Sequence, residues 1–133
     1  WNRDAPASGE PAFEPRPDLL PADAVELLSL DEATFSERFE PTPLERPGRV
    51  GLVRNAAIVT GNAGDPVAVP PLANLLDDDS DTLRGTAAWA LGRIGTSEAV
   101  SALRARRAVE NNGAVIEELD AALRDAASRR STA

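Results

Sequence analysis

The chain has 133 residues, enough for one domain with a modest core, and its formal net charge is −8. It contains no His, Cys, Lys, Tyr or Met, and all 14 basic residues are Arg. This composition removes the usual general base, the thiolate nucleophile and the Schiff-base amine, together with the imidazole and thiolate ligands of zinc, haem and iron–sulfur clusters.

The charge and hydropathy of the chain restrict its partners. A net charge of −8 argues against a generally basic nucleic-acid binder, although a local patch of Arg is compatible with it. No apolar run approaches the roughly 20 residues that span a membrane, and no secretory signal pattern is present. We therefore expect no membrane partner. A cytoplasmic location and a monomeric state are further expectations. Because the sequence opens at Trp1, we expect it to be a piece of a longer protein.

The N-terminal part is rich in proline. Residues 1–21 hold five of the 11 prolines, which disfavour helix interiors and sheet ladders, so this segment is predicted to be an extended connector. Residues 22–47 are predicted to be a helical segment and a linker. Apolar positions over 22–39 follow a helical pattern, which Ser29 and Asp31 could divide into two short helices, and three prolines follow in 40–47.

Residues 48–133 carry an internal repeat of about 31 residues. The matched positions are Leu52 and Leu83, Ala56 and Ala87, Ala57 and Ala88, Gly61 and Gly92, Gly64 and Gly95, Ala68 and Ala99, and Leu72 and Leu103. A repeat of this length predicts stacked helical hairpins, because a single hairpin cannot bury its apolar face alone. The fold class is therefore an all-α solenoid, with two hairpins and a capping helix.

Local signals place the first hairpin. Its first helix is predicted over about 49–62, with Gly64 as the left-handed cap. Asp65-Pro66 pairs an N-cap oxygen with proline at the first helical position, which predicts a new start. Pro70 and Pro71 conflict with one smooth helix, so a short turn over 66–69 and a second helix from near Pro70 are expected.

The second hairpin repeats this arrangement. Its first helix is predicted over about 81–94, followed by Gly95, with Thr96 or Ser97 as the next cap. The second helix carries Arg104, Arg106 and Arg107 and is predicted to end at 111–113. A terminal helix over 114 to about 127 is expected to turn Val115, Leu119 and Ala122 inward.

The direction of the side chains on the first helix of the second hairpin separates core from surface. At about 100° per residue, one stripe forms the core face, and it consists of Leu83, Ala87, Leu91 and Ile94. Trp89 falls nearly opposite, where a nucleobase could stack on it. Since Ile58 occupies the equivalent position in the first hairpin, we instead expect Trp89 to be buried in a second packing surface.

A polar strip is predicted on a further face of these helices. It consists of Asn55 and Asn62 in the first hairpin and of Thr86 and Arg93 in the second. The simple interpretation is a solvated helix face. The functional interpretation is a tRNA-binding set of donors facing a phosphate backbone, assisted by Arg46, Arg49 and Arg54.

Acidic residues are expected to lie apart from this strip. They fall in the run 77–81 and in the terminal helix, at Glu117, Glu118 and Asp120. The run resembles the start of a calcium loop, which requires Gly at its sixth position and Glu at its twelfth. These positions are Thr82 and Ala88 here, so the sequence does not predict a calcium site. Carboxylates that cap a helix N-terminus explain the run.

Two motifs in order resemble the C-terminal HEAT-like region of bacterial epoxyqueuosine reductase. The first comprises residues 52–55 (Leu-Val-Arg-Asn) with Gly61-Asn62, behind the segment 42–46, and the second is the stretch 84–95. The opening residues Trp-Asn-Arg resemble the segment after that family's last iron–sulfur Cys-Pro. One departure is Thr86, where the family more often has His.

The resemblance implies HEAT-like repeats and a parent enzyme that reduces epoxyqueuosine to queuosine in the tRNA wobble position. That enzyme would use cobalamin and two [4Fe–4S] clusters held by an upstream catalytic domain. This chain would hold no metal, no cofactor and no catalytic residue, and would contribute to tRNA binding. The alternative is a HEAT-type scaffold for protein–protein interaction, since solenoids commonly bind proteins on their extended faces. A stand-alone enzyme is the third possibility.

Overall fold

The computed structural model describes residues 21–39 and 48–132, and every regular element within them is helical. These elements are α1 (Pro21–Leu27), α2 (Glu32–Phe39), α3 (Gly48–Ala63), the short 3-10 helix η3 (Pro66–Ala68), α4 (Val69–Leu75), α5 (Asp81–Ile94), α6 (Ser97–Arg107) and α7 (Gly113–Thr132). The predicted all-α class is confirmed. The connector predicted over 1–21 and the linker over 40–47, with Arg46, fall almost entirely outside the described residues.

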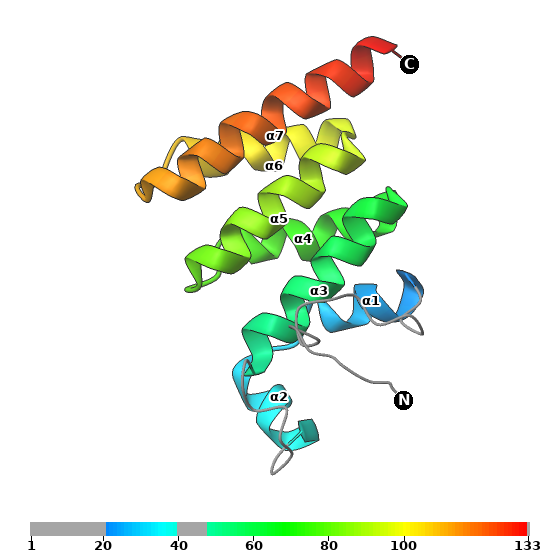
Figure 1. Cartoon of the computed structure of the whole chain (residues 1–133), viewed down its shortest axis with the longest axis vertical. Coiled ribbons are helices and arrows are strands. Elements are labelled where there is room, and N and C mark those ends of the chain that lie inside the picture. The colour runs from blue at the N-terminus through cyan, green and yellow to red at the C-terminus, as the bar shows by residue number, and fades with distance from the viewer. Residues whose placement is uncertain (1–20, 40–47, 133) are drawn as a thin grey trace, which may run out of the picture.

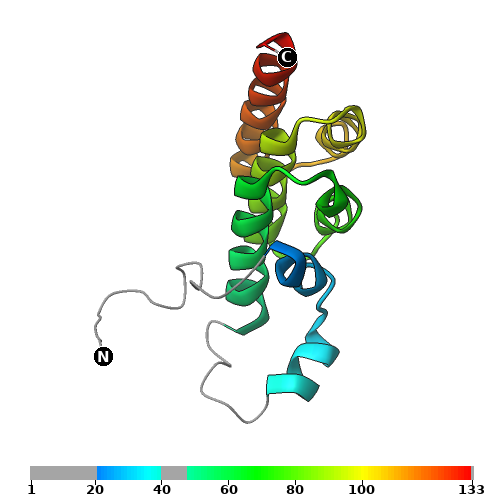
Figure 2. The same cartoon turned by 90° about the vertical axis from the view of Figure 1, so that its right-hand side faces the viewer.

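The helices form two layers (Figure 1). Helices α3, α5 and α7 lie side by side in one layer, here called the A layer, and α1, α4 and α6 line up behind them in the B layer (Figure 2). Within the A layer, α5 packs against α3 on one side and against α7 on the other. The arrangement is the solenoid that the repeat predicts, with α7 in the place of the first helix of a third unit.

The expected caps divide the chain into these helices. Gly64 and Gly95 both have a positive φ, of 69° and 72°, and the Gly95 N–H donates to the Leu91 carbonyl. The Asp65 carboxylate accepts from the Val67 N–H at 3.0 Å and begins η3. The Thr96 hydroxyl accepts from the Ala99 N–H at 3.1 Å and begins α6.

The core follows the 31-residue register. Equivalent alanines and leucines of the two hairpins are buried together in one core. All of the following are fully buried: Ala56 with Ala87, Ala57 with Ala88, Ala68 with Ala99, and Leu72 with Leu103. In α7, Val115, Leu119 and Ala122 are buried as predicted. Ile94, by contrast, is only half-buried at the end of the predicted core stripe.

The equivalent glycines Gly61 and Gly92 mark the closest approaches in the A layer. A Cβ atom on Gly61 would lie 3.0 Å from the Cα of Ala90, and one on Gly92 would lie 2.8 Å from the Cα of Ala122. The second distance is shorter than real Cβ contacts allow, and the first is tighter than nearly all of them. Glycine at these positions therefore lets α3 meet α5, and α5 meet α7, almost backbone to backbone.

Two predicted helix ends are wrong. Helix α6 ends at Arg107 rather than near 111, because the hydrogen-bond pattern then tightens into a turn, with the Val109 N–H donating to the Arg106 carbonyl three residues earlier at 3.0 Å. Helix α7 continues to Thr132 instead of about 127, since no glycine or proline interrupts its last turns.

A buried ion-pair cluster holds the connection between α6 and α7. The carboxylate of Glu110 accepts from Arg84 at 2.9 and 3.0 Å, from Arg106 at 2.8 Å and from the Asn112 N–H at 3.2 Å. These hydrogen bonds, foremost those from Arg84, lower the pKa of Glu110 to about 2 although its side chain is fully buried. The cluster fixes the point at which α7 begins.

Candidate nucleic-acid interface

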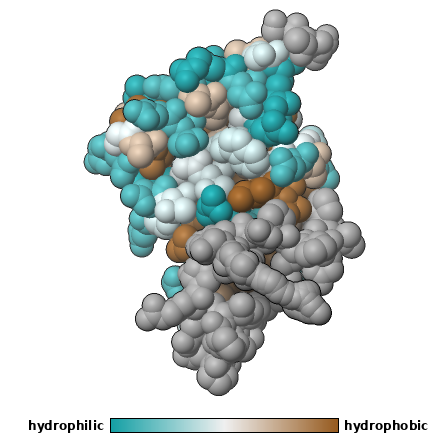
Figure 3. Space-filling view, in the orientation of Figure 1, coloured by the Kyte–Doolittle hydropathy of each residue, from teal (hydrophilic) through white to brown (hydrophobic). Residues whose placement is uncertain are grey.

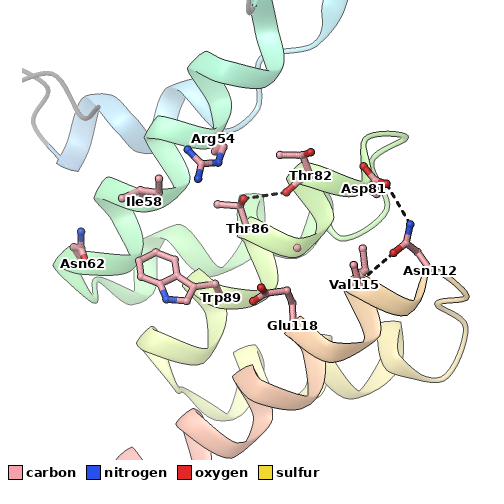
Figure 4. A pocket seen from close by; sticks show the side chains of 12 residues that line it. Arg54, Ile58, Asn62, Asp81, Thr82, Thr86, Trp89, Asn112, Val115 and Glu118 are labelled. Atoms are coloured by element: carbon pink, nitrogen blue, oxygen red, sulfur yellow. Dashed lines mark hydrogen bonds between the residues drawn. The ribbon is translucent and has the colours of Figure 1, made fainter. Parts of the chain in front are cut away.

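A hollow of about 650 Å³ opens on the A layer between α3, α5 and the start of α7 (Figure 4). Each of the three helices contributes side chains to its wall. They include Arg54, Ile58 and Asn62 from α3, Asp81, Thr82, Thr86 and Trp89 from α5, Asn112 just before α7, and Val115 and Glu118 from α7. We call this feature the Trp89 hollow. Its volume lies in the range of ligand-binding clefts.

Helical spacing explains how these residues converge. Residues 54, 58 and 62 follow one another at intervals of four, which places them on one face of α3. Residues 82, 86 and 89 do the same on α5, at intervals of four and three. Gly85, a buried residue of α5, also lines the hollow and contributes no side chain to it. The hollow is thus a product of the stack and belongs to no single helix.

Trp89 forms the apolar centre of the hollow. Its ring points from α5 toward Ile58 and Asn62 on α3 (Figure 4). The ring is half-buried, and an added Cβ on Gly61 would lie 2.8 Å from its Cζ3 atom. The expectation that Trp89 packs against the neighbouring helix is therefore confirmed in part, since the same side chain also lines an open surface.

Arg93 lies one turn beyond Trp89, with its guanidinium carbon 5.7 Å from the centre of the indole ring. Within the described part of the chain, no carboxylate pairs with Arg93, and its buried Nε atom has no hydrogen-bond partner. An aromatic ring rather than an anion thus orients this cation. The guanidinium keeps donors for an anion that arrives from outside.

The structure separates the residues of the predicted polar strip. Arg54, Asn62 and Thr86 line the Trp89 hollow, and Arg93 stands beside it. Asn55 is 5% exposed, because α3 packs between α1 and α5 and has only a narrow open face. The prediction that Asn55 shares an accessible strip with Asn62 is therefore wrong.

Arg49 is held within the protein. Its guanidinium binds both carboxylate oxygens of Asp78, at 2.5 and 3.4 Å, and donates to the Leu30 carbonyl at 2.6 Å. The pKa of Asp78 is lowered by hydrogen bonds from Arg49 and from the Ser80 N–H, which together outweigh the effect of its burial. Asp78 thus ties the loop before α5 to α3, and the proposed phosphate contact of Arg49 would require this pair to open.

The expected segregation of acids from basic residues is wrong. Asp78 pairs with Arg49 across 29 residues of sequence, and Asp77 pairs with Arg106 at 3.1 Å. Asp81 and Glu118 line the same hollow as Arg54. Sequence reasoning placed these acids in a loop and a cap, and it missed that both elements border the A-layer face.

The wider surface around the hollow is mixed in polarity. Apolar atoms gather beside the upper half of α3, and hydrophilic atoms dominate over α7 (Figure 3). Among residues 21–39 and 48–132, His, Cys, Asp and Glu form no group of three or more that could hold a metal ion. Across the same residues, none of the helices has the length and apolarity needed to cross a membrane.

Known protein families include one with the same repeat architecture. Residues 52–126 match the family model of HEAT repeats. The chain belongs to the HEAT-repeat family. The matched range begins in α3 and ends in α7, so it contains α5 and the parts of α3 and α7 that line the Trp89 hollow.

Curated relatives and solved structures point to one kind of protein. The chain is 38% identical over 96 residues to epoxyqueuosine reductase from Xanthomonas campestris pv. campestris, covering 71% of the chain and 27% of the relative. It is 34% identical over 110 residues to the Listeria monocytogenes enzyme, covering 82% and 29%. The resemblance to epoxyqueuosine reductase is confirmed, and the chain spans less than a third of these relatives.

The fold is similar to part of two solved structures of epoxyqueuosine reductase. One is a crystal structure of epoxyqueuosine reductase with a tRNA-Tyr epoxyqueuosine-modified tRNA stem loop, at a TM-score of 0.71 and 27% identity. It is matched over 77% of this chain and 28% of that one. The other, from Bacillus subtilis, has a TM-score of 0.70 with the same coverage.

Proposed function

We propose that this chain is the helical-repeat part of an epoxyqueuosine reductase, which reduces epoxyqueuosine to queuosine in tRNA, and that it contributes to tRNA binding. The observation that carries the proposal is its likeness, over 77% of its length, to a reductase solved with a tRNA stem loop. The reduction would take place in another part of the enzyme. Cobalamin and two [4Fe–4S] clusters would belong there too, because this chain has no Cys or His to hold them.

Arg93 gives the proposal a physical basis on this surface. It lies on the A layer, presents a planar guanidinium and is oriented by Trp89 rather than by a carboxylate. A guanidinium can donate two parallel hydrogen bonds to a phosphate without first leaving an ion pair. Arg54, on the neighbouring helix α3, would add a second phosphate contact from the other side of the hollow.

The test is the salt dependence of RNA binding by single charge reversals. A fluorescently labelled tRNA anticodon stem loop is titrated with the chain at several salt concentrations. Arg93→Glu or Arg54→Glu should weaken binding and reduce the slope of log affinity against log salt by about one for each lost phosphate contact. Arg104→Glu is the matched control, because Arg104 is exposed on α6 in the B layer.

Circular dichroism establishes that each variant keeps its helical content. If both A-layer reversals leave the affinity and the slope unchanged while the variants stay folded, tRNA binding through this face is refuted. The HEAT-type protein scaffold would then become the better explanation, since solenoid faces commonly bind proteins. A reduction by Arg104→Glu equal to that of Arg93→Glu would also contradict the proposal, because it would indicate attraction without a defined site.

A further inference from the structure

We propose that the Trp89 hollow holds one unpaired nucleobase that carries an exocyclic amino group, at a point where an RNA strand runs along the A layer. The inference rests on the proposed function and adds to it the ligand chemistry of one subsite. Three observations carry it: an aromatic floor, carboxylates on the wall beside that floor, and a cation just outside.

The floor of the hollow suits a planar group. Trp89 presents its indole ring, and Ile58 extends the apolar surface on the α3 side (Figure 4). At Gly85 the α5 backbone carries no side chain, and even an added Cβ would meet only the Glu118 Cγ, at 3.5 Å. A base that is unpaired and splayed out of its strand can enter such a site and stack on the indole, whereas a paired base cannot.

The carboxylates on the wall select a base over a phosphate. Asp81 and Glu118 are both exposed and both border the hollow, while Arg54 is a single cation on the opposite side. A phosphate inside the hollow would meet two negative charges. A carboxylate instead accepts hydrogen bonds from the amino groups of cytosine, adenine or guanine. Uracil has carbonyl oxygens in place of an amino group, so it is disfavoured.

The position of Arg93 completes the arrangement. Its guanidinium lies over the same indole ring that would stack with the base. Arg93 itself lies one helical turn after Trp89 and does not line the hollow. A strand whose base enters the hollow would therefore carry its phosphate past Arg93. Carboxylates near the base and a cation near the phosphate match the two ends of a nucleotide.

The experiment uses RNA hairpins that differ only in one unpaired loop residue, which is cytosine, adenine, uracil or an abasic site. The chain has two tryptophans, so Trp1→Phe leaves Trp89 as the single fluorophore. Binding of the cytosine and adenine hairpins should quench Trp89 fluorescence, and the abasic hairpin should bind without quenching. Affinity should fall at least about fivefold from cytosine to the abasic hairpin, as expected for the loss of one stacked base.

Two variants separate this role from a structural one. Trp89→Leu replaces the indole with an aliphatic side chain, similar to Ile58 at the equivalent position of the first repeat. This variant should lose the preference for a base over an abasic site. Glu118→Gln should reduce the preference for cytosine over uracil at least about fivefold. Glu117→Gln is its matched control, because Glu117 is the exposed neighbour on α7 that does not line the hollow.

The outcomes distinguish this inference from the proposed function. If RNA binds with a salt slope that depends on Arg93, but Trp89 is not quenched and base identity has no effect, the nucleobase site is refuted and the tRNA-binding proposal stands. If no hairpin binds at all, both are refuted. Quenching of Trp89 by a Lys-rich peptide, with no response to any hairpin, would assign the hollow to a protein partner and overturn the inference.

Discussion

Replacing Glu110 by Gln should remove a stabilisation that depends on pH. In the folded chain, hydrogen bonds from Arg84 and Arg106 lower the pKa of this carboxyl from 4.5 to about 2. A difference of this size corresponds to about 3 kcal/mol of folding free energy at pH 7. The Gln variant keeps the shape of the side chain but leaves two cations facing a neutral amide, so it should be less stable by about that amount.

The sign of the pH effect follows from the lowered pKa. Because the unfolded chain takes up the proton first as the pH falls, the contribution of Glu110 is complete above about pH 5 and is lost toward pH 2. At pH 3 about 2 kcal/mol of it should already be gone. The stability gap between the wild-type chain and Glu110→Gln should therefore shrink from about 3 to about 1 kcal/mol between pH 7 and pH 3.

Urea denaturation followed by far-ultraviolet circular dichroism at several pH values measures this gap. Glu117→Gln, a change of the same chemistry at an exposed position of α7, should show no gap at either pH. A gap between wild type and Glu110→Gln that stays constant from pH 7 to pH 3 would refute the reasoning, since it would place the effect in packing rather than in charge.

Further predictions concern the packing and the caps. Gly92→Ala should destabilise the chain by about 1–3 kcal/mol, because its Cβ would meet the Ala122 backbone at 2.8 Å. Gly85→Ala should stabilise the chain by up to about 1 kcal/mol, because the nearest atom to its Cβ would be 3.5 Å away. Thermal unfolding of both variants tests the pair, and equal effects on stability would contradict the reasoning. Ser80→Ala should cost about 1 kcal/mol in urea denaturation, since the Ser80 hydroxyl caps α5, and no loss would mean that water caps the helix equally well. Leu103→Ala should cost about 2–5 kcal/mol in the same assay, because the side chain is fully buried between the layers, and a cost below about 1 kcal/mol would show that the core closes over the gap.

Much of the fold could be predicted because its determinants are local. The glycines at 64 and 95 and the caps at Asp65 and Thr96 act within one or two helical turns, and the 31-residue spacing of small residues is visible in the sequence itself. Each determinant could be recognised without knowing what packs against it. Helix ends without such a residue, as at the end of α7, were predicted less well.

The candidate site could be predicted only in part, because it depends on which helices become neighbours. Arg54, Asn62 and Thr86 share helix faces that the sequence identifies, and they do line the hollow. Asn55 lies on the same helix but is buried, because α3 packs between α1 and α5 and its neighbours cannot be identified from its own residues. The acids Asp81 and Glu118 join the site only through the packing of α5 against α7.

The glycine contacts between the helices of the A layer influence the shape of the surface, because they set how closely these helices approach. At Gly61, α3 rests on Ala90 and on the edge of the Trp89 ring with no side chain between them. A single methyl group there would act as a wedge and push apart the two helices that form opposite walls of the hollow. The groups that line it would be unchanged, yet the distance between Arg54 on one wall and the indole on the other would grow. Substitutions at such buried positions would thus change the width of the hollow, and with it the ligands that it accommodates, while every residue that lines the hollow stays the same.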